Sequence, residues 1–280
     1  MSVCIGLCVY KNEFGLPYVF KNIERIQTLF SEKIQVIVAY DECPDCSLGI
    51  ILSKLDSLNI HILKNTKPVL YSRIQRISNA RNQILEHIRN FASNPKYLIM
   101  MDSNEYACIG DIQLDVLKEA FDREKEWDSV SFDREAGYYD HWALSFDPFI
   151  YSFFHTINYQ NTVAKLREYF EKIMENAKKT PDVFLPVFSA FNGFAIYKWQ
   201  IFQSSIYSTQ IDISLFPVEI IKKQIEITGV PIIDKLDEDC EHRYFHLKAI
   251  REKNARIFIY PKSLFAKFTG EKKKNCRGPC

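Results

Sequence analysis

The sequence predicts an α/β protein with a mostly parallel central sheet flanked by helices, in one continuous domain. Three observations predict this class. Short apolar runs rich in β-branched residues alternate with segments of helical periodicity over residues 3–102, which is typical of a parallel sheet covered on both faces. The length of 280 residues fits one large domain. Apolar residues make up 47% and charged residues 25% of the chain, the usual mix of a globular protein.

Four strands and three helices are expected in the first half. The strands are expected at residues 3–10, 34–40, 60–63 and 97–101. The helices are expected at residues 17–30, 48–58 and 72–91. In open parallel sheets, ligands bind beyond the carboxyl ends of the strands. Residues 10–12, Asp41 and Asp102 are therefore the first places to search for a site.

The second half is less regular. Its strands are expected at residues 127–133, 142–146 and 256–260, with a loop and then a strand over 188–197. Its helices are expected at residues 159–178 and 239–253. The basic tail, residues 271–280, is expected to be flexible because it carries few apolar side chains.

Charge and hydropathy exclude several function classes. Lysine plus arginine number 36 and aspartate plus glutamate 35, so no global positive field attracts nucleic acid, and any bound anion needs a local cluster. The start has no signal-peptide pattern, and no apolar run approaches the ~20 residues of a membrane span. A soluble cytoplasmic protein is expected, in the host cytoplasm if the chain is viral. In that compartment the 8 cysteines are expected to be free thiols, with Cys4 and Cys8 in the core.

The helix over residues 72–91 carries an arginine on its apolar side. At helical spacing, Arg81 falls inside the stripe formed by Ile74, Ile84 and Leu85. A buried guanidinium keeps its charge and needs a carboxylate or phosphate partner. Asp102 and a bound diphosphate are the two candidates, and an arginine extending out of the stripe into water is the alternative. Arg73 and Arg76, near the start of the helix, add to the case for phosphate binding.

Oxygen-bearing side chains follow the fourth strand. Asp102, Asn104 and Glu105 come directly after its apolar run. Closely spaced oxygen donors suit a hard divalent cation such as Mg²⁺, which binds one or two carboxylates plus substrate phosphates. A polar turn that closes a strand is the simpler reading of the same residues.

The order of the motifs along the chain resembles a known family. The Ala80-Arg81-Asn82 helix precedes the strand ending in Asp102-Ser103-Asn104, and three later stretches read YYDHWAL (138–144), FNGFAIY (191–197) and EDCEHRYFH (238–246). Together they resemble GT-A-type glycosyltransferases, in a branch with fungal, bacterial and large-DNA-virus members. The resemblance implies a Rossmann-like GT-A domain over residues 1–270, with a nucleotide-binding half (1–105) and an acceptor-side half (106–270).

The resemblance also implies a donor site. Asp102, with Asn104 or Glu105, is expected to hold a Mn²⁺ or Mg²⁺ ion that bridges the diphosphate of a nucleotide sugar, with a UDP-sugar favoured over a GDP-sugar. Asn104 departs from the family's second aspartate, which puts metal dependence in question. Asp41 is expected near the base or ribose. Arg73, Arg76 and Arg81 are expected to neutralise phosphate charge or to orient Asp102.

The acceptor side is expected around the last motif. Asp239 is the expected base for a glycan or glycoconjugate hydroxyl, with Glu238 second, although a helix N-terminus also favours carboxylates. His242 and His246 are expected as metal ligands or phosphate contacts.

Sugar contacts are expected at a second place on the acceptor side. Asp140 and Trp142 suit a sugar, which offers hydroxyls and apolar faces. Asn192 and Gly193 suit a tight turn with exposed amides, and a plain hairpin is the alternative.

Other functions stay open at this point. A non-catalytic sugar- or nucleotide-binding protein is one, since Asn104 weakens the metal motif. Cys43-Pro-Asp-Cys46 follows a strand and opens a helix, as in thioredoxin-like redox proteins. Cys43 and Cys46 could instead form a zinc site with Cys276 and Cys280. A nucleotidyltransferase is a weaker option because the segment after the first strand contains a single glycine, Gly15.

Overall fold

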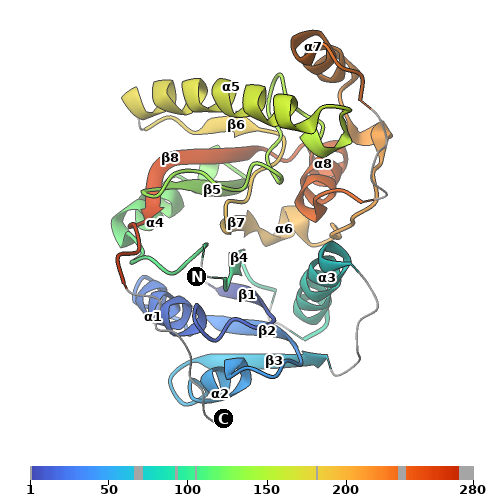
Figure 1. The fold of residues 1–280 in the computed structure, drawn as a ribbon. Coiled ribbons are helices and arrows are strands. Elements are labelled where there is room, and N and C mark those ends of the chain that lie inside the picture. Colours follow the sequence, from blue (N-terminus) through green and yellow to red (C-terminus); the bar gives the residue numbers. More distant parts are fainter. Residues whose placement is uncertain are drawn as a thin grey trace.

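The computed structural model describes residues 2–65, 72–91, 94–104, 106–180, 182–232 and 238–270. The calls that concern Glu105 and the tail at 271–280 lie outside these residues, as do Cys276 and Cys280. Within them, a sheet of eight strands has the order β3-β2-β1-β4-β7-β5-β8-β6 (Figure 1).

Four parallel strands form the first half of the sheet. They are β1 (Val3–Val9), β2 (Gln35–Asp41), β3 (Asn59–Asn65) and β4 (Tyr97–Asp102). Cys8 of β1 pairs with Asp102 of β4, and Val9 pairs with Tyr40 of β2. The carboxyl ends of β1, β2 and β4 therefore meet at one edge of the sheet. The prediction of a mostly parallel sheet is confirmed, and these four strands match the expected ones closely.

The second half of the sheet mixes directions. β7 (Phe194–Lys198) is antiparallel to both β4 and β5 (Ser129–Arg134). β8 (Ile257–Phe265) runs parallel to β5, and β6 (Leu185–Val187) closes the edge antiparallel to β8. β8 continues through Pro261, beyond its expected end, with register shifts opposite Asp133. Such irregularities are where a strand accommodates proline.

Helices cover both faces of the sheet, as predicted. One apolar cluster joins the sheet to α1 (Leu16–Gln27), α2 (Ser47–Leu52) and α4 (Leu114–Asp122). A second joins the other face to α3 (Arg73–Phe91), α5 (Tyr159–Lys179), α6 (Trp199–Phe202) and α8 (Glu241–Lys253). Cys4 is buried in this second cluster and Cys8 packs against it, which confirms both as core residues. Helix α7 (Val218–Thr228) packs at the side, against a small third cluster.

The expected strand over residues 142–146 is wrong. Ser145 forms a single bridge to Ser189, and Phe146 turns back to pair with Phe149. The side chain of Asp140 accepts the backbone N–H of Ala143 at 3.2 Å and closes a turn. The segment is therefore a folded loop. Helices α4, α6 and α7 and strand β6 were not expected. None of the helices in the described residues is long and apolar enough to cross a bilayer.

Candidate active site

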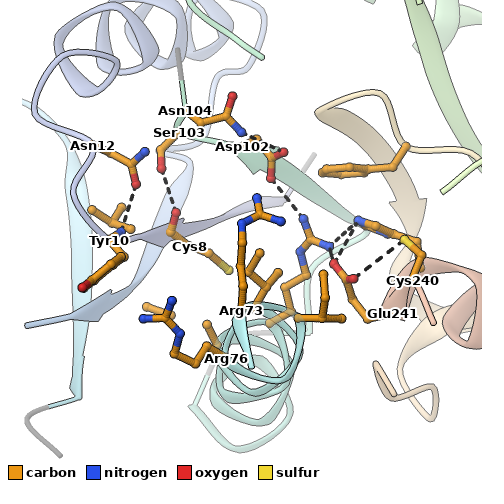
Figure 2. A pocket seen from close by; sticks show the side chains of 18 of the residues that line it. Cys8, Tyr10, Asn12, Arg73, Arg76, Asp102, Ser103, Asn104, Cys240 and Glu241 are labelled. Atoms are coloured by element: carbon orange, nitrogen blue, oxygen red, sulfur yellow. Dashed lines mark hydrogen bonds and ion pairs between the residues drawn. The ribbon is translucent and has the colours of Figure 1, made fainter. Parts of the chain in front are cut away.

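A cavity of about 390 Å³ opens at the carboxyl edge of β1, β2 and β4. Figure 2 shows Tyr10 and Asn12 at one end, Cys240 and Glu241 at the other, and Arg73 and Arg76 between them. Nine of the residues singled out from the sequence line it: Asp41, Arg73, Arg76, Arg81, Asp102, Asn104, Asp140, Trp142 and His242. The topology thus brings together most of the predicted site residues from distant parts of the chain.

Arg81 lies buried on α3, with 3% of its surface exposed. Its Nη2 donates to Oδ1 of Asp102 at 3.0 Å. Its Nη1 contacts a carboxylate oxygen of Glu241 and Nε2 of His242. Burial disfavours the charge, but Glu241 and Asp102 hold the pKa of Arg81 above its usual value. The predicted partnership of Arg81 with Asp102 is confirmed, and Glu241 is a partner that the sequence did not reveal.

Asp102 and Asn104 are the residues most suited to a metal, and their oxygens already have partners. One carboxylate oxygen of Asp102 accepts from Arg81, and the other from Nδ2 of Asn104 at 3.4 Å. The amide oxygen of Asn104 accepts the backbone N–H of Tyr106 at 2.9 Å. The described part of the chain contains no group of three His, Cys, Asp or Glu side chains that could hold a metal ion. The described residues therefore offer Asp102 and Asn104 as oxygen ligands at this strand end, and Glu105 lies outside them.

Arg73 and Arg76 supply positive charge that no carboxylate of the described residues neutralises. Both lie on the first turns of α3, whose N-terminus itself favours anions. The Arg76 guanidinium lies 4.8 Å from the ring centre of Tyr10, and its buried Nε has no hydrogen-bond partner. Arg73 is close enough to Asp102 to lower the pKa of that carboxyl, against the larger opposite effect of burial. The part of the cavity at the start of α3 therefore suits an anion.

Asp140 and Trp142 line the cavity from the loop after β5. Burial, and then the negative charge of Asp102, raises the pKa of Asp140 to about 7. The loop is fixed by Asn192, whose side-chain oxygen accepts the N–H of Tyr139 at 3.0 Å and whose amide donates to the carbonyl of Phe132 at 2.9 Å.

The turn at Asn192 and Gly193 supports the site without lining the cavity. Both residues have positive φ, and Asn192 is buried. The carbonyl of Gly193 accepts the backbone N–H of Asp102 at 2.8 Å. The prediction of exposed backbone amides at this turn is therefore wrong. The turn instead holds the end of β4 and the 139–140 loop in place.

Asp239 and Glu238 also lie outside the cavity lining. The carboxylate of Asp239 is buried and bound by Arg243, one turn along α8. Arg243 in turn donates to Oγ of Ser145 at 2.8 Å and to the carbonyl of Trp142 at 2.5 Å. Glu238 accepts from Ser72 at 2.7 Å, just before α3. Neither position supports the predicted role of base, and Asp239 instead orients Arg243 toward the loop that carries Trp142.

His246 lies deeper than His242. Its ring nitrogens meet Ser189 at 2.9 Å and Tyr197 at 3.2 Å, and it is fully buried. Burial, followed by the charges of Arg81 and Arg243, lowers the pKa of His246 to about 3. The expected metal or phosphate contact is therefore not available to His246. His242 reaches the cavity, where it stacks on Phe191 at 3.9 Å and contacts Arg81.

Asp41 and the nearby cysteines lie at the β2 side. Asp41 lines the cavity, and its Oδ1 accepts from Asn65 at 3.1 Å. Cys43 is a free thiol whose pKa is raised chiefly by burial. Reactive redox cysteines need the opposite shift, so the structure does not favour the redox function. Cys46 is disulfide-bonded, so the expectation that all 8 cysteines are free thiols is wrong, and Cys46 is not a free ligand for the zinc alternative. That alternative also requires Cys276 and Cys280, which lie outside the described residues.

Similar folds occur among solved structures, although no protein-family model and no curated protein matches the sequence. S. aureus TarS is 13% identical, with 95% of this chain and 36% of that chain covered and a TM-score of 0.53. TarS 1-349 in complex with UDP is 14% identical over 95% of this chain and 60% of that chain, with a TM-score of 0.52. TarS 1-349 in complex with UDP-GlcNAc is 15% identical over 97% of this chain and 60% of that chain, with a TM-score of 0.50. This chain thus spans at most 60% of these three chains.

At these identities the likeness shows the fold. It is the GT-A-type, Rossmann-like α/β fold expected from the motifs, with its mixed sheet flanked by helices.

Proposed function

We propose that the protein is a glycosyltransferase that moves a sugar from a nucleotide-diphospho-sugar donor to a hydroxyl of a glycan or glycoconjugate. The observation that carries the proposal is the pair of unneutralised arginines, Arg73 and Arg76, at the carboxyl edge of a GT-A-type sheet. The negative charge of a donor diphosphate would complement the positive charge of these two guanidinium groups. The crystal structures of TarS with UDP and UDP-GlcNAc support a nucleotide sugar, and a UDP-sugar in particular, as the ligand of this fold.

The two ends of the cavity suit the two parts of such a donor. Asp41 and Tyr10, at the ends of β2 and β1, are placed for the nucleoside. Asp140 and Trp142 are placed for the sugar, with one carboxylate for hydroxyls and one aromatic face for C–H groups. The diphosphate then lies along α3, where Arg73 and Arg76 stabilise the charge of the departing nucleoside diphosphate. The volume of about 390 Å³ is within the range of small-molecule sites.

No step of this proposal depends on a metal. Arg81 forms ion pairs with both Asp102 and Glu241. The prediction of a Mn²⁺ or Mg²⁺ ion stays a prediction, to be tested directly by comparing donor binding with and without the ion.

Thermal unfolding in the presence of UDP-, GDP- and CMP-sugars, each with and without Mn²⁺, tests donor binding. A ligand at a hundred times its Kd stabilises the protein by about 2.7 kcal/mol. We expect one nucleotide class to raise Tm, and the double variant Arg73→Ala/Arg76→Ala to lose that shift. The matched control is Arg25→Ala, a surface arginine on α1. No shift with any sugar nucleotide would overturn the proposal.

Release of the nucleoside diphosphate separates an enzyme from a binding protein. A protein that binds the donor and releases no nucleotide, with water or with a panel of glycan acceptors, is the non-catalytic binding module.

A further inference from the structure

Two carboxylates that line the cavity, Asp140 and Asp41, are held by no cation of the described residues. Asp140 uses Oδ1 to accept the N–H of Ala143 at 3.2 Å. Among the described residues, no hydrogen bond or ion pair engages its second oxygen. Asp140 lines the cavity beside Trp142, so this oxygen is available to a ligand.

The other acidic groups on this side of the site are committed. Asp102 and Glu241 both pair with Arg81, and Asp239 pairs with Arg243 outside the cavity lining. A carboxylate paired with a guanidinium is a poor proton acceptor, because protonation forfeits the ion pair. Asp41 lacks an arginine partner in the described chain, but it ends β2, on the far side of β1 from β4. Asp140 lies on the opposite side, fixed to the turn before β7.

Asp140 and the anion-binding arginines line the same cavity, as a base and a leaving-group site must in a displacement reaction. In Figure 2, Arg73 and Arg76 lie between the β1 end of the cavity, marked by Tyr10 and Asn12, and the α8 end, marked by Glu241. A donor with its diphosphate on the arginines directs its sugar toward the α8 end. A base for the acceptor hydroxyl must then line the cavity near that sugar.

Building on the proposed glycosyl transfer, we propose that Asp140 is the catalytic base. Its free carboxylate oxygen takes the proton of the acceptor hydroxyl while that hydroxyl oxygen bonds to the anomeric carbon. The bond from the anomeric carbon to the diphosphate oxygen breaks, and its electron pair leaves with the nucleoside diphosphate. The transfer is a single displacement, so it inverts the anomeric configuration. Water in place of the acceptor gives hydrolysis of the donor by the same step.

The surroundings of Asp140 support this role. Burial and the charges of Asp102 on β4 and Glu241 on α8 raise its pKa to about 7, and Arg81 on α3 opposes the shift. A base is most effective when its pKa lies near the working pH. Asn192 is a positioning residue for it, since its side-chain oxygen accepts the backbone N–H of Asp140 at 3.4 Å.

The test compares Asp140→Asn with wild type, using the nucleotide sugar that gives the largest thermal shift and water as acceptor. Asparagine keeps an oxygen for the N–H of Ala143, so the turn is preserved. We expect donor Kd to change less than about threefold while nucleotide release falls by about 10²–10⁴-fold. The rise of the wild-type rate through pH 7 should be absent in the variant, and NMR of the wild-type product should show inversion. Asp147→Asn, an exposed change near the same loop, is the control.

The outcomes are distinguishable. Nucleotide release by Asp140→Asn within a few-fold of wild type overturns the assignment, as does a retained anomeric configuration. The assignment also falls if Asp239→Asn, still folded and donor-bound, is the variant that loses turnover. A wild-type protein that neither binds nor hydrolyses any nucleotide sugar instead overturns the proposed function itself, and the role of Asp140 with it.

Discussion

The change Arg81→Gln tests the charge arrangement at the centre of the site. Arg81 is the cation between Asp102 and Glu241, and their side chains are 4%, 23% and 5% exposed, respectively. Removing one partner of a buried ion pair leaves an uncompensated charge and costs about 3–5 kcal/mol. We expect Arg81→Gln to lower the free energy of unfolding by that amount in urea denaturation at pH 7.5, followed by far-UV circular dichroism.

The control and the pH dependence sharpen this test. Arg25 pairs with Asp111 at 3.6 Å on the surface, and the two side chains are 37% and 59% exposed. Arg25→Gln should therefore cost no more than about 1 kcal/mol. The cost of Arg81→Gln should shrink as the pH falls and the two stranded carboxylates take up protons. A loss for Arg81→Gln no larger than that for Arg25→Gln, or one independent of pH, would refute the reasoning.

Three further predictions concern the walls of the cavity. Arg73→Ala should weaken binding of UDP about tenfold or more in isothermal titration calorimetry, since a hydrogen bond to a charged group contributes about 1.5–3 kcal/mol; unchanged affinity would remove Arg73 from the anion site. Gly193→Ala should lower Tm, because φ is +84° and a Cβ would lie 2.7 Å from both Ala107 Cβ and Tyr139 Oη; an unaltered Tm would contradict that packing. The folded-state pKa of Asp140, about 7, lies above its ordinary 3.8, so its stabilisation is present at low pH and lost as pH rises through 7. From pH 5 to 8, urea denaturation should show wild type losing up to about 3 kcal/mol relative to Asp140→Asn, and a constant difference would count against the raised pKa.

The parallel half of the fold could be predicted because its signals are local. Four buried apolar strands and the helices between them are legible from periodicity, and the carboxyl-edge rule then placed Asp41 and Asp102 at a common site. Arg81 was predictable for a related reason, since a guanidinium within an apolar stripe demands a partner. Its second partner was not predictable, because Glu241 is 160 residues away in the sequence and nothing local marks their contact.

The second half shows where local reasoning fails. A helix beginning at Asp239 places Asp239, His242 and His246 on one side. Helix α8 begins at Glu241 with Cys240 as its N-cap, so Asp239 precedes the helix and the expected shared side does not form. A helical wheel places only residues within the helix, so it does not place Asp239, whereas Glu241, the first residue of α8, lines the cavity. Element ends are the least certain part of a sequence prediction.

Charge pairing separates the acids that build this site from the acid that is free to react in it. Arg81 links α3 to β4 and to the first residue of α8, and Arg243, in the first turn of α8, links that helix to the loop that carries Trp142. Asp102, Glu241 and Asp239 all form ion pairs with these arginines. The ion pairs hold the cavity walls in place and make the three carboxylates weaker bases. Among the cavity-lining groups of the described residues, these ion pairs leave two cations, Arg73 and Arg76, and two anions, Asp41 on the β2 side and Asp140 on the loop after β5. A base for the incoming hydroxyl and positive charge for the departing diphosphate are what glycosyl transfer requires, and they are the groups that the fold leaves unneutralised.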